Sequence, residues 1–424
     1  MTAIIHRVPG SRRDFLRYAA AAFLPPPQPR RPNILVFMTD QESKLLPGPV
    51  NTPNRRRIEV RGVQFTNAFC NTPQCSAARS ALLTGLEPHQ SGVLTNVDAE
   101  SLGKPLRPDL PNIGSVLRAA GYRTGYFGKW HLGNEAGDLH NYGFDVYRHA
   151  GDDASASQAA QWIESQTRPW LAWVSVLNPH NIYDLASVRT TAPRDGVLAP
   201  HTDLANLAGK PAEQQAYVDQ DQGRQTRAFN SEDWLRYRTR YCELVEKADQ
   251  SLGKVLAAVK DWDSTGIVYT SDHGDALGEH GLPFKGPFMY DPLIRVPLVI
   301  SAPWKWKAGS RSDMTVQSDL APTIAGLTGV AWPGKNTGFD LTQGPTGRDA
   351  VFLEYYAKQK WVNPIRTIRT ARWKLNWYNS GHQELYDLQA DPHEMRNLAA
   401  DAAAATTRRA LEARLDRWHP ALRE

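Results

Sequence analysis

Four segments of this chain are almost continuously apolar, and each is followed by polar or charged residues. They span residues 33–40, 123–129, 170–177 and 265–271. Continuous rather than alternating hydrophobicity is typical of strands that are buried on both faces, as in a largely parallel sheet covered by helices. We therefore predict an α/β fold with a large, mostly parallel central sheet sandwiched by helices.

Helical periodicity lies between these segments. Apolar residues recur three or four positions apart over residues 113–120 and 237–259, and Gly121 follows the first stretch where a helix cap belongs. In a fold that alternates strands with helices, ligands bind at the carboxyl ends of the strands. The polar residues that follow the four strands are therefore expected to meet at one edge of the sheet. They are Asp40 and Gln41, Lys129 to His131, Asn178 to His180, and Asp272 to Gly274.

The chain departs from this alternation in two places. Residues 181–230 are rich in Pro, Asp and Gln and predict a long excursion over the surface, either solvated or lining a substrate cleft. The Gly- and Pro-rich residues 329–348 resemble a linker. We predict a catalytic α/β domain over residues 32–340 and a small α+β subdomain over 341–424, with antiparallel strands and a terminal helix. The apolar face of that helix comprises Leu411, Leu415 and Trp418.

The charge distribution restricts the class of partner. Six of the 49 Lys and Arg residues and one of the 44 Asp and Glu residues lie in residues 1–31. Residues 32–424 are therefore formally neutral, although the whole chain carries +5, and we expect no nucleic-acid partner. An apolar content of 41% is that of a folded globular protein and excludes a disordered or collagen-like chain.

The N-terminal residues resemble an export signal. Arg12 and Arg13 precede Phe15 and a weakly apolar run over residues 18–24, which is the twin-arginine pattern. That run is far shorter than the roughly 20 residues that a membrane-spanning helix needs, so we expect no stable membrane anchor. We predict that residues 1–31 are a twin-arginine signal peptide and that the protein is periplasmic or secreted. The alternative is a basic N-terminus on a cytoplasmic protein.

Cys75 stands at the start of a predicted short helix that ends at Gly85. Free backbone N–H groups and the positive end of the helix dipole favour an anion and a nucleophile at such a position. Arg79 lies one turn on, where its guanidinium can hold the nucleophile or a tetrahedral anion. The alternative is a small cysteine that only packs. The chain has two other cysteines, Cys70 and Cys242, and no pattern typical of a disulfide framework or a zinc site.

Two acidic strand ends predict a metal site. Asp40 is followed by Gln41, and Asp272 by His273. Two carboxylates at the ends of buried strands repel each other unless a cation lies between them. Oxygen-dominated ligation favours Ca²⁺ or Mg²⁺, and the histidine nitrogen also allows Mn²⁺. The alternative, turn and cap formation, explains one such acid but not several together.

Four further residues follow strands or lie in a loop bounded by Gly and Pro: Lys129, His131, His180 and Lys285. Singly, each is more often a surface residue or a satisfied polar residue. Together at one edge of a sheet, they would supply positive charge for a leaving oxyanion and a proton for the departing alcohol.

The order of these residues resembles that of type I sulfatases, the formylglycine-dependent arylsulfatase family of the alkaline-phosphatase-like superfamily. Residues 75–85 (CSAARSALLTG) resemble the first signature of the family, and residues 121–131 resemble the second. Residues 272–281 with Lys285 are similar to its metal and lysine segment, and residues 384–398 to its C-terminal ending. Several motifs in the same order over most of the chain make chance implausible.

The resemblance implies that a formylglycine-generating maturation enzyme oxidises Cys75 to formylglycine, and that one hydroxyl of the hydrated aldehyde attacks the sulfur of a small sulfated substrate. It implies one divalent metal, Ca²⁺ first and Mg²⁺ or Mn²⁺ as alternatives. The metal ligands would be Asp40, Gln41, Cys75, Asp272 and His273. An aldehyde hydrate can expel sulfate in a second step, whereas an ordinary alcohol would remain a stable sulfate ester.

The resemblance also implies roles around the reacting sulfate. Arg79 and Lys129 would stabilise the nucleophile, and His131 its neighbouring hydroxyl. His180 and Lys285 would contact the sulfate and protonate the leaving oxygen.

Some positions depart from the commoner family pattern. Ala77 stands where the aerobic maturation enzyme prefers Pro, and His180 is followed by Asn-Ile-Tyr rather than by x-Pro-Tyr. Gln41 and His273 replace an Asp and an Asn, and they resemble the choline-sulfatase and phosphonate-monoester-hydrolase branches. We predict a sulfatase acting on a sulfate ester of a carbohydrate or an aryl alcohol. Two alternatives remain open: a phosphonate monoester or phosphodiester hydrolase of the same fold, and an unmodified, non-catalytic glycan-binding relative.

Overall fold

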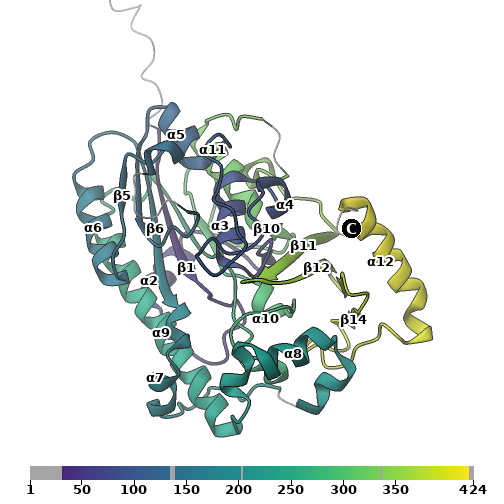
Figure 1. Cartoon of the computed structure of the whole chain (residues 1–424). Coiled ribbons are helices and arrows are strands. Elements are labelled where there is room, and N and C mark those ends of the chain that lie inside the picture. The colour runs from purple at the N-terminus through teal and green to yellow at the C-terminus, as the bar shows by residue number, and fades with distance from the viewer. Residues whose placement is uncertain (1–30, 134–138, 202–203, 335–336, 420–424) are drawn as a thin grey trace, which may run out of the picture. The chain divides into compact units, whose positions relative to one another are not determined.

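Eight strands form the central sheet of the computed structural model, in the order β5-β4-β6-β1-β7-β8-β2-β9 (Figure 1). They are β1 (Asn33–Asp40), β2 (Val63–Phe65), β4 (Arg123–Gly128), β5 (Val146–Arg148), β6 (Trp170–Pro179), β7 (Thr265–Ser271), β8 (Leu298–Ser301) and β9 (Gly309–Arg311). The four apolar segments form β4, β6, β1 and β7, which are adjacent and parallel. The predicted mostly parallel sheet is therefore confirmed. Strand β8 is the exception, because it runs antiparallel to β7 and β2.

The structure describes residues 31–133, 139–201, 204–334 and 337–419. Residues 32–424 make up one compact unit. The predicted twin-arginine pattern lies outside the described residues. In the described ranges, we find no helix with the length and apolarity that a membrane crossing requires.

Helices cover both faces of the sheet. They are α2 (Pro53–Glu59), α3 (Cys75–Thr84), α4 (Pro88–Ser91), α5 (Ile113–Ala119), α6 (Asp152–Glu164), α7 (Leu185–Thr190), α8 (Ala212–Gln220), α9 (Ser231–Ala257), α10 (Asp291–Ile294), α11 (Leu320–Thr328) and α12 (Ala405–Trp418). Alternate residues of a strand point to opposite faces. Leu35 and Phe37 of β1 therefore share an apolar cluster with α6 and α9, whereas Ile34 and Val36 share another with α5 and α11. Figure 1 shows these two pairs of helices on opposite sides of the sheet.

The two helices that the sequence predicts are both present. Helix α5 is followed by Gly121 at φ +89°, a left-handed conformation that glycine adopts without strain. Helix α9 begins before the apolar pattern does, because Asn230 caps it. The Asn230 side chain accepts hydrogen bonds from the backbone N–H groups of Glu232 and Asp233, and the Asp233 carboxylate accepts one from the backbone of Asn230.

Residues 181–230 are not the extended surface excursion that their composition predicts, because they contain α7 and α8. Tyr217 and Val218 of α8 are buried. Gln214 is also fully buried and donates a 2.9 Å hydrogen bond to Glu384. Helix α8 thus packs partly through a buried polar network, which leaves little apolar periodicity to detect in the sequence.

The C-terminal part has the predicted antiparallel strands and terminal helix. Strands β11 (Ala350–Lys358), β12 (Trp361–Thr370), β13 (Trp373–Tyr378) and β14 (Gln383–Asp387) form a four-stranded antiparallel sheet. Leu411 and Leu415 of α12 pack against Ile368 and Leu375 of this sheet. A separate two-stranded sheet joins β3 (Ala68–Phe69) to β10 (Thr315–Val316). The domain boundary at residue 340 stays a prediction.

Candidate functional site

Helix α3 places Cys75 in the interior, at the carboxyl edge of the central sheet. All ten residues of α3 are buried, and Cys75 is 1% exposed. The small side chains of α3, such as Ala77 and Ala78, let this helix lie close to the elements packed against it. The helix ends at Gly85, whose φ of +68° makes it a left-handed cap, so the predicted helix start and stop are confirmed.

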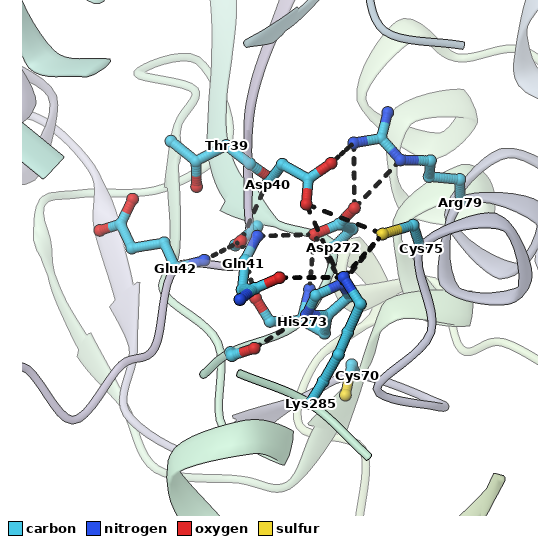
Figure 2. A network of polar contacts seen from close by, with 12 residues as sticks. Thr39, Asp40, Gln41, Glu42, Cys70, Cys75, Arg79, Asp272, His273 and Lys285 are labelled. Atoms are coloured by element: carbon cyan, nitrogen blue, oxygen red, sulfur yellow. Dashed lines mark hydrogen bonds and ion pairs between the residues drawn. The ribbon is translucent and has the colours of Figure 1, made fainter. Parts of the chain in front are cut away.

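Two fully buried carboxylates lie beside this helix (Figure 2). Asp40 ends β1, and Asp272 follows the adjacent parallel strand β7. The Arg79 guanidinium bridges the two, at 2.8 Å from Asp40 Oδ2 and with Nε 3.0 Å from Asp272 Oδ2. The other arm of the guanidinium donates to Ser175 Oγ at 2.8 Å. Arg79 is therefore held by a network of charge-assisted hydrogen bonds that also fixes both acids.

The Cys75 sulfur lies at the centre of a ring of polar atoms. Lys285 Nζ is 3.1 Å from Sγ, and His273 Nε2 is 3.3 Å from it. Lys129 Nζ is 3.6 Å away, and Asp40 Oδ1 is 3.8 Å away. The structure thus brings five of the predicted site residues into direct contact, from segments that are far apart in the sequence. Figure 2 shows four of them: Asp40, Cys75, His273 and Lys285.

The His273 ring is oriented by the backbone. Its Nδ1 lies 2.8 Å from the carbonyl oxygen of Gly274, which is a hydrogen-bond acceptor, so Nδ1 carries the proton. Nε2 lies 3.3 Å from Cys75 Sγ and 3.7 Å from Asp272 Oδ1. A backbone carbonyl that fixes the tautomer in this way is common for histidines that bind a metal.

The donor set fits a divalent cation. One ligand atom each of Asp40, Cys75, Asp272 and His273 lies within 4.8 Å of the others, and all four residues are buried. Burial raises the pKa of Asp272, and the negative charge of Asp40 raises it further. A cation between the two acids would remove this repulsion. Hard oxygen ligands with one imidazole suit Ca²⁺, Mg²⁺ or Mn²⁺.

Electrostatics favour an anion at residue 75. Burial alone would raise the pKa of the Cys75 thiol, and Asp40 would raise it further, but Lys129, Lys285 and His273 together hold it well below its usual value. Likewise, burial alone would raise the pKa of Asp40, but the positive charges of Lys129 and Arg79 outweigh burial and hold it well below the usual range. The site therefore stabilises a negatively charged nucleophile beside a cationic wall.

Gln41 has a specific orientation within the site. Its Oε1 accepts a 2.9 Å hydrogen bond from Lys285 Nζ, and its Nε2 donates one of 2.7 Å to Asp275 Oδ2. The amide oxygen therefore faces the reactive side, as a metal ligand would. Sequence reasoning missed Asp275, although it directly follows residues 272–274. It also missed Ser175, whose signal was a hydroxyl inside the apolar segment of β6.

Two predicted residues lie at the rim rather than in the ring. Among the described residues, the His131 imidazole has no hydrogen bond to Cys75, and its Nε2 is 3.9 Å from Asp98 Oδ2. His180 packs against Tyr183, with 4.8 Å between ring centroids. Burial lowers the pKa of His180 to about 3, so the substrate-free imidazole is neutral. The roles of both histidines stay predictions.

The sequence profile of the sulfatase family matches residues 32–330, and that of the N-sulphoglucosamine sulphohydrolase C-terminal region matches residues 278–420. The chain belongs to the sulfatase family. Its members are sulfuric ester hydrolases, so the predicted enzyme class and family are confirmed.

Individual relatives agree with this assignment. The chain is 28% identical to the Delta 4,5-hexuronate-2-O-sulfatase of Bacteroides thetaiotaomicron, over 88% of this chain and 85% of the relative. It is also 28% identical to the choline-sulfatase of Rhizobium meliloti, over 87% of this chain and 82% of the relative. Another matched relative, from Drosophila melanogaster, is named as an extracellular sulfatase homologue.

Solved structures confirm the alkaline-phosphatase-like fold. A 2-O GAG sulfatase superposes with a TM-score of 0.81 at 24% identity, over 93% of each chain. The phosphonate monoester hydrolase of Agrobacterium radiobacter superposes with a TM-score of 0.75 at 25% identity, over 91% of this chain and 95% of that one. The fold alone therefore does not separate sulfate from phosphonate esters.

Proposed function

We propose that this protein hydrolyses the sulfate ester of a carbohydrate through a formylglycine made from Cys75 and one divalent metal. The observation that carries the proposal is the buried ring around Sγ, in which two carboxylates, an imidazole and two ammonium groups face one atom. The carbohydrate part rests on relatives named as a hexuronate sulfatase and an N-acetylglucosamine-6-O-sulfatase.

The nucleophile is formed by a separate maturation enzyme. That enzyme supplies the oxidant that converts the Cys75 side chain to an aldehyde with loss of the sulfur, and water then adds to give two hydroxyls on Cβ. One hydroxyl oxygen takes the place of Sγ, so the contacts of Sγ represent those of this hydroxyl. Lys129 and Lys285, at 3.6 and 3.1 Å, would stabilise its deprotonated form.

The metal would be held by Asp40, Gln41, Asp272, His273 and residue 75. When bound, it supplies positive charge that lowers the pKa of a nearby hydroxyl and polarises the sulfate oxygens. Arg79 keeps Asp40 and Asp272 in place by donating to both. These residues are buried, so they are pre-organised and need little rearrangement during the reaction.

The first chemical step transfers the sulfuryl group to residue 75. The hydroxyl oxygen forms a bond to sulfur while the bond from sulfur to the leaving alcohol oxygen breaks. A proton passes to that oxygen from Lys285 or His180. Lys285 is the better placed of the two in the free site, because its Nζ lies 3.1 Å from the atom that the nucleophile replaces, whereas burial lowers the pKa of His180 to about 3.

The second step releases sulfate. The remaining hydroxyl of residue 75 loses its proton, the carbon–oxygen double bond re-forms, and the bond from Cβ to the sulfate oxygen breaks. The aldehyde is thereby regenerated for the next cycle. We assign His131 to this second hydroxyl, as the family resemblance implies. The backbone carbonyl of His131 accepts a 2.5 Å hydrogen bond from the hydroxyl of Ser76, the residue that follows Cys75.

We further propose that residues 1–31 direct export by the twin-arginine pathway to the periplasm or the medium. That pathway carries folded proteins, so oxidation of Cys75 and metal loading would precede transport. Residues 32–340 would form the catalytic domain and residues 341–424 the C-terminal subdomain.

A second candidate is hydrolysis of phosphonate monoesters or phosphodiesters. Gln41 and His273 favour it, and so does the superposition on a phosphonate monoester hydrolase. Sulfate and phosphonate esters share a tetrahedral centre, so the same residues fit both. The non-catalytic glycan-binding alternative rests on Ala77 alone.

Matched aryl esters separate these candidates. We expect the purified protein to release alcohol from 4-nitrophenyl sulfate with a higher kcat/KM than from 4-nitrophenyl phenylphosphonate. A large preference for the phosphonate would overturn the sulfatase proposal. Glycan binding without turnover of either ester would support the non-catalytic alternative.

A further inference from the structure

A groove of about 580 Å³ lies between the end of α8 and the turn that joins β11 to β12. Its walls come from three segments. Helix α8 and its end contribute Gln220 and Asp221, the turn contributes residues 358–361, and the loop after α4 contributes Glu100. None of the predicted catalytic or metal-binding residues lines it.

The groove is connected to the catalytic site through residues 95–100. Asn96 Oδ1 accepts a hydrogen bond from the backbone of Ser76, the residue after Cys75, and Ser76 Oγ accepts one from the backbone of Val97. At the other end of this loop, Thr95 Oγ1 donates to the carbonyl of Ala357 at 2.8 Å. One short loop therefore contacts both the start of the catalytic helix and the strand that leads into the groove.

A second path runs along the accessible rim of the catalytic site. Lys129 of the ring and His131 at its rim keep 15% and 16% of their side chains exposed, whereas the rest of the ring is buried. The site is therefore accessible from this side. His131 faces Asp98. Two residues on, Glu100 accepts a 3.3 Å hydrogen bond from Gln359 in the turn. The loop of residues 95–100 therefore runs from the rim of the catalytic site to the groove.

The side chains of the groove are those that bind sugars. Trp361 is partly buried against the core and offers a flat aromatic face for the apolar side of a sugar ring. Gln220, Gln359 and Asp221 supply amide and carboxylate groups that bind hydroxyls. Lys360 is exposed and supplies an ammonium group for hydroxyl or acidic substituents.

Lys358 makes one wall of the groove rigid. Its side chain is 8% exposed, its ammonium is 2.9 Å from Asp221 Oδ2, and it lies 4.4 Å from the centre of the Tyr217 ring. Burial lowers its pKa to about 8 although Asp221 opposes the effect. A buried lysine that ties the β11–β12 turn to α8 keeps both sides of the groove at a fixed separation, as a preformed binding site requires.

We propose that this groove is a subsite for a sugar residue linked to the sulfated one, so that the substrate is a sulfated oligosaccharide rather than a monosaccharide sulfate. Trp361 stacks on this second ring, and Gln220, Gln359 and Asp221 bind its hydroxyls. The inference rests on the proposed function, because it concerns the alcohol that leaves in the first step. It adds that this alcohol contains a further sugar ring, and it names the residues that bind that ring.

The test compares the cleavage of substrates of different length by the wild-type protein and by a variant that lacks the Trp361 side chain. The probes are 4-nitrophenyl sulfate and sulfated mono-, di- and tetrasaccharides prepared from heparin, chondroitin sulfate and carrageenan. The variants are Trp361→Ala and, as a matched control, Trp304→Ala, whose indole is 41% exposed and lies near β8 rather than in the groove. Circular dichroism and melting temperature check that both variants fold.

We expect the wild-type protein to cleave at least one disaccharide or tetrasaccharide with a kcat/KM tenfold or more above that for the matching monosaccharide sulfate. Trp361→Ala should lower this ratio at least fivefold, through KM more than kcat, and Trp304→Ala should leave the ratio unchanged. Equal kcat/KM values for monosaccharide and oligosaccharide, or an equal loss on both in Trp361→Ala, would overturn the subsite.

Direct binding keeps the subsite testable if the sulfatase activity itself is absent. Calorimetric titration of Cys75→Ala and of Cys75→Ala/Trp361→Ala with the same tetrasaccharides does not depend on turnover. A Kd at least tenfold weaker in the double variant supports the subsite even where the proposed reaction fails. Identical binding by both variants, or no binding by either, refutes it.

Discussion

Replacement of Lys285 by alanine tests the assigned proton donor most sharply. Its Nζ is 3.1 Å from Cys75 Sγ, 3.1 Å from His273 Nε2 and 2.9 Å from Gln41 Oε1. The side chain is buried, so neither water nor another residue readily replaces the ammonium. The variant therefore removes one positive charge and one proton from the centre of the site.

The expected loss follows from these contacts. Removing one pre-organised donor from a developing oxyanion costs about 10²- to 10³-fold in kcat, or roughly 3 to 4 kcal/mol. Loss of a general acid adds a cost that depends on the leaving group, typically 10²- to 10⁴-fold when the leaving oxygen needs a proton. We therefore expect about a 10²- to 10³-fold loss on 4-nitrophenyl sulfate, whose phenolate leaves readily, and a larger loss on a sugar sulfate.

The assay compares kcat for both esters in wild type, Lys285→Ala and His180→Ala. The residue that protonates the leaving oxygen is identified by its variant. That variant should lower kcat for the sugar sulfate at least tenfold more than kcat for the aryl sulfate. Lys254→Ala, a lysine on α9 that pairs with Asp153 outside the ring, serves as the control. A loss below threefold in Lys285→Ala, or equal losses on both esters in Lys285→Ala, would refute its assignment as the acid.

Three further outcomes are expected. Chelation by EDTA should abolish activity and lower the melting temperature, because Asp40 and Asp272 then repel each other, and added Ca²⁺ should restore both; activity that survives exhaustive chelation argues against the metal. Asp275→Asn should lower kcat/KM about tenfold without loss of fold, because Asp275 accepts the 2.7 Å hydrogen bond that orients Gln41; wild-type kinetics would contradict this positioning role. Burial and the charge of Glu354 raise the pKa of Glu87 to about 7. The folded state therefore keeps a proton that the unfolded state loses above about pH 4.5, so stability falls as pH rises from about 4.5 to 7, by about 3 kcal/mol. Chemical denaturation at pH 5 and 7 should show this fall in wild type and a smaller one in Glu87→Gln.

The central part of the fold follows from local sequence patterns. Strands buried on both faces, such as β1 and β6, need apolar residues at every position, and this requirement is visible without a structure. Parallel strands then place their carboxyl ends at one edge, which is why Asp40 and Asp272 were predicted to be neighbours. Cys75 also followed from local signals, a helix start and a glycine stop.

Other features depend on contacts that the sequence does not encode locally. Helix α8 buries Gln214 against Glu384, so its packing partner is 170 residues away and its pattern is polar. The short strand β8 pairs antiparallel with β7. The direction of this strand depends on how the chain connects the two strands in the folded structure. Asp275 acts through Gln41, and only the folded structure shows that the two side chains meet.

The oxidation state of residue 75 in the active protein tests the account most directly. Peptide mass spectrometry of protein purified from its native host, with activity measured on the same sample, determines this state. We predict that active protein yields a peptide lighter than its cysteine form that reacts with an aldehyde-specific hydrazide probe. Full activity in a sample whose residue 75 is entirely an unmodified thiol would contradict the proposed chemistry.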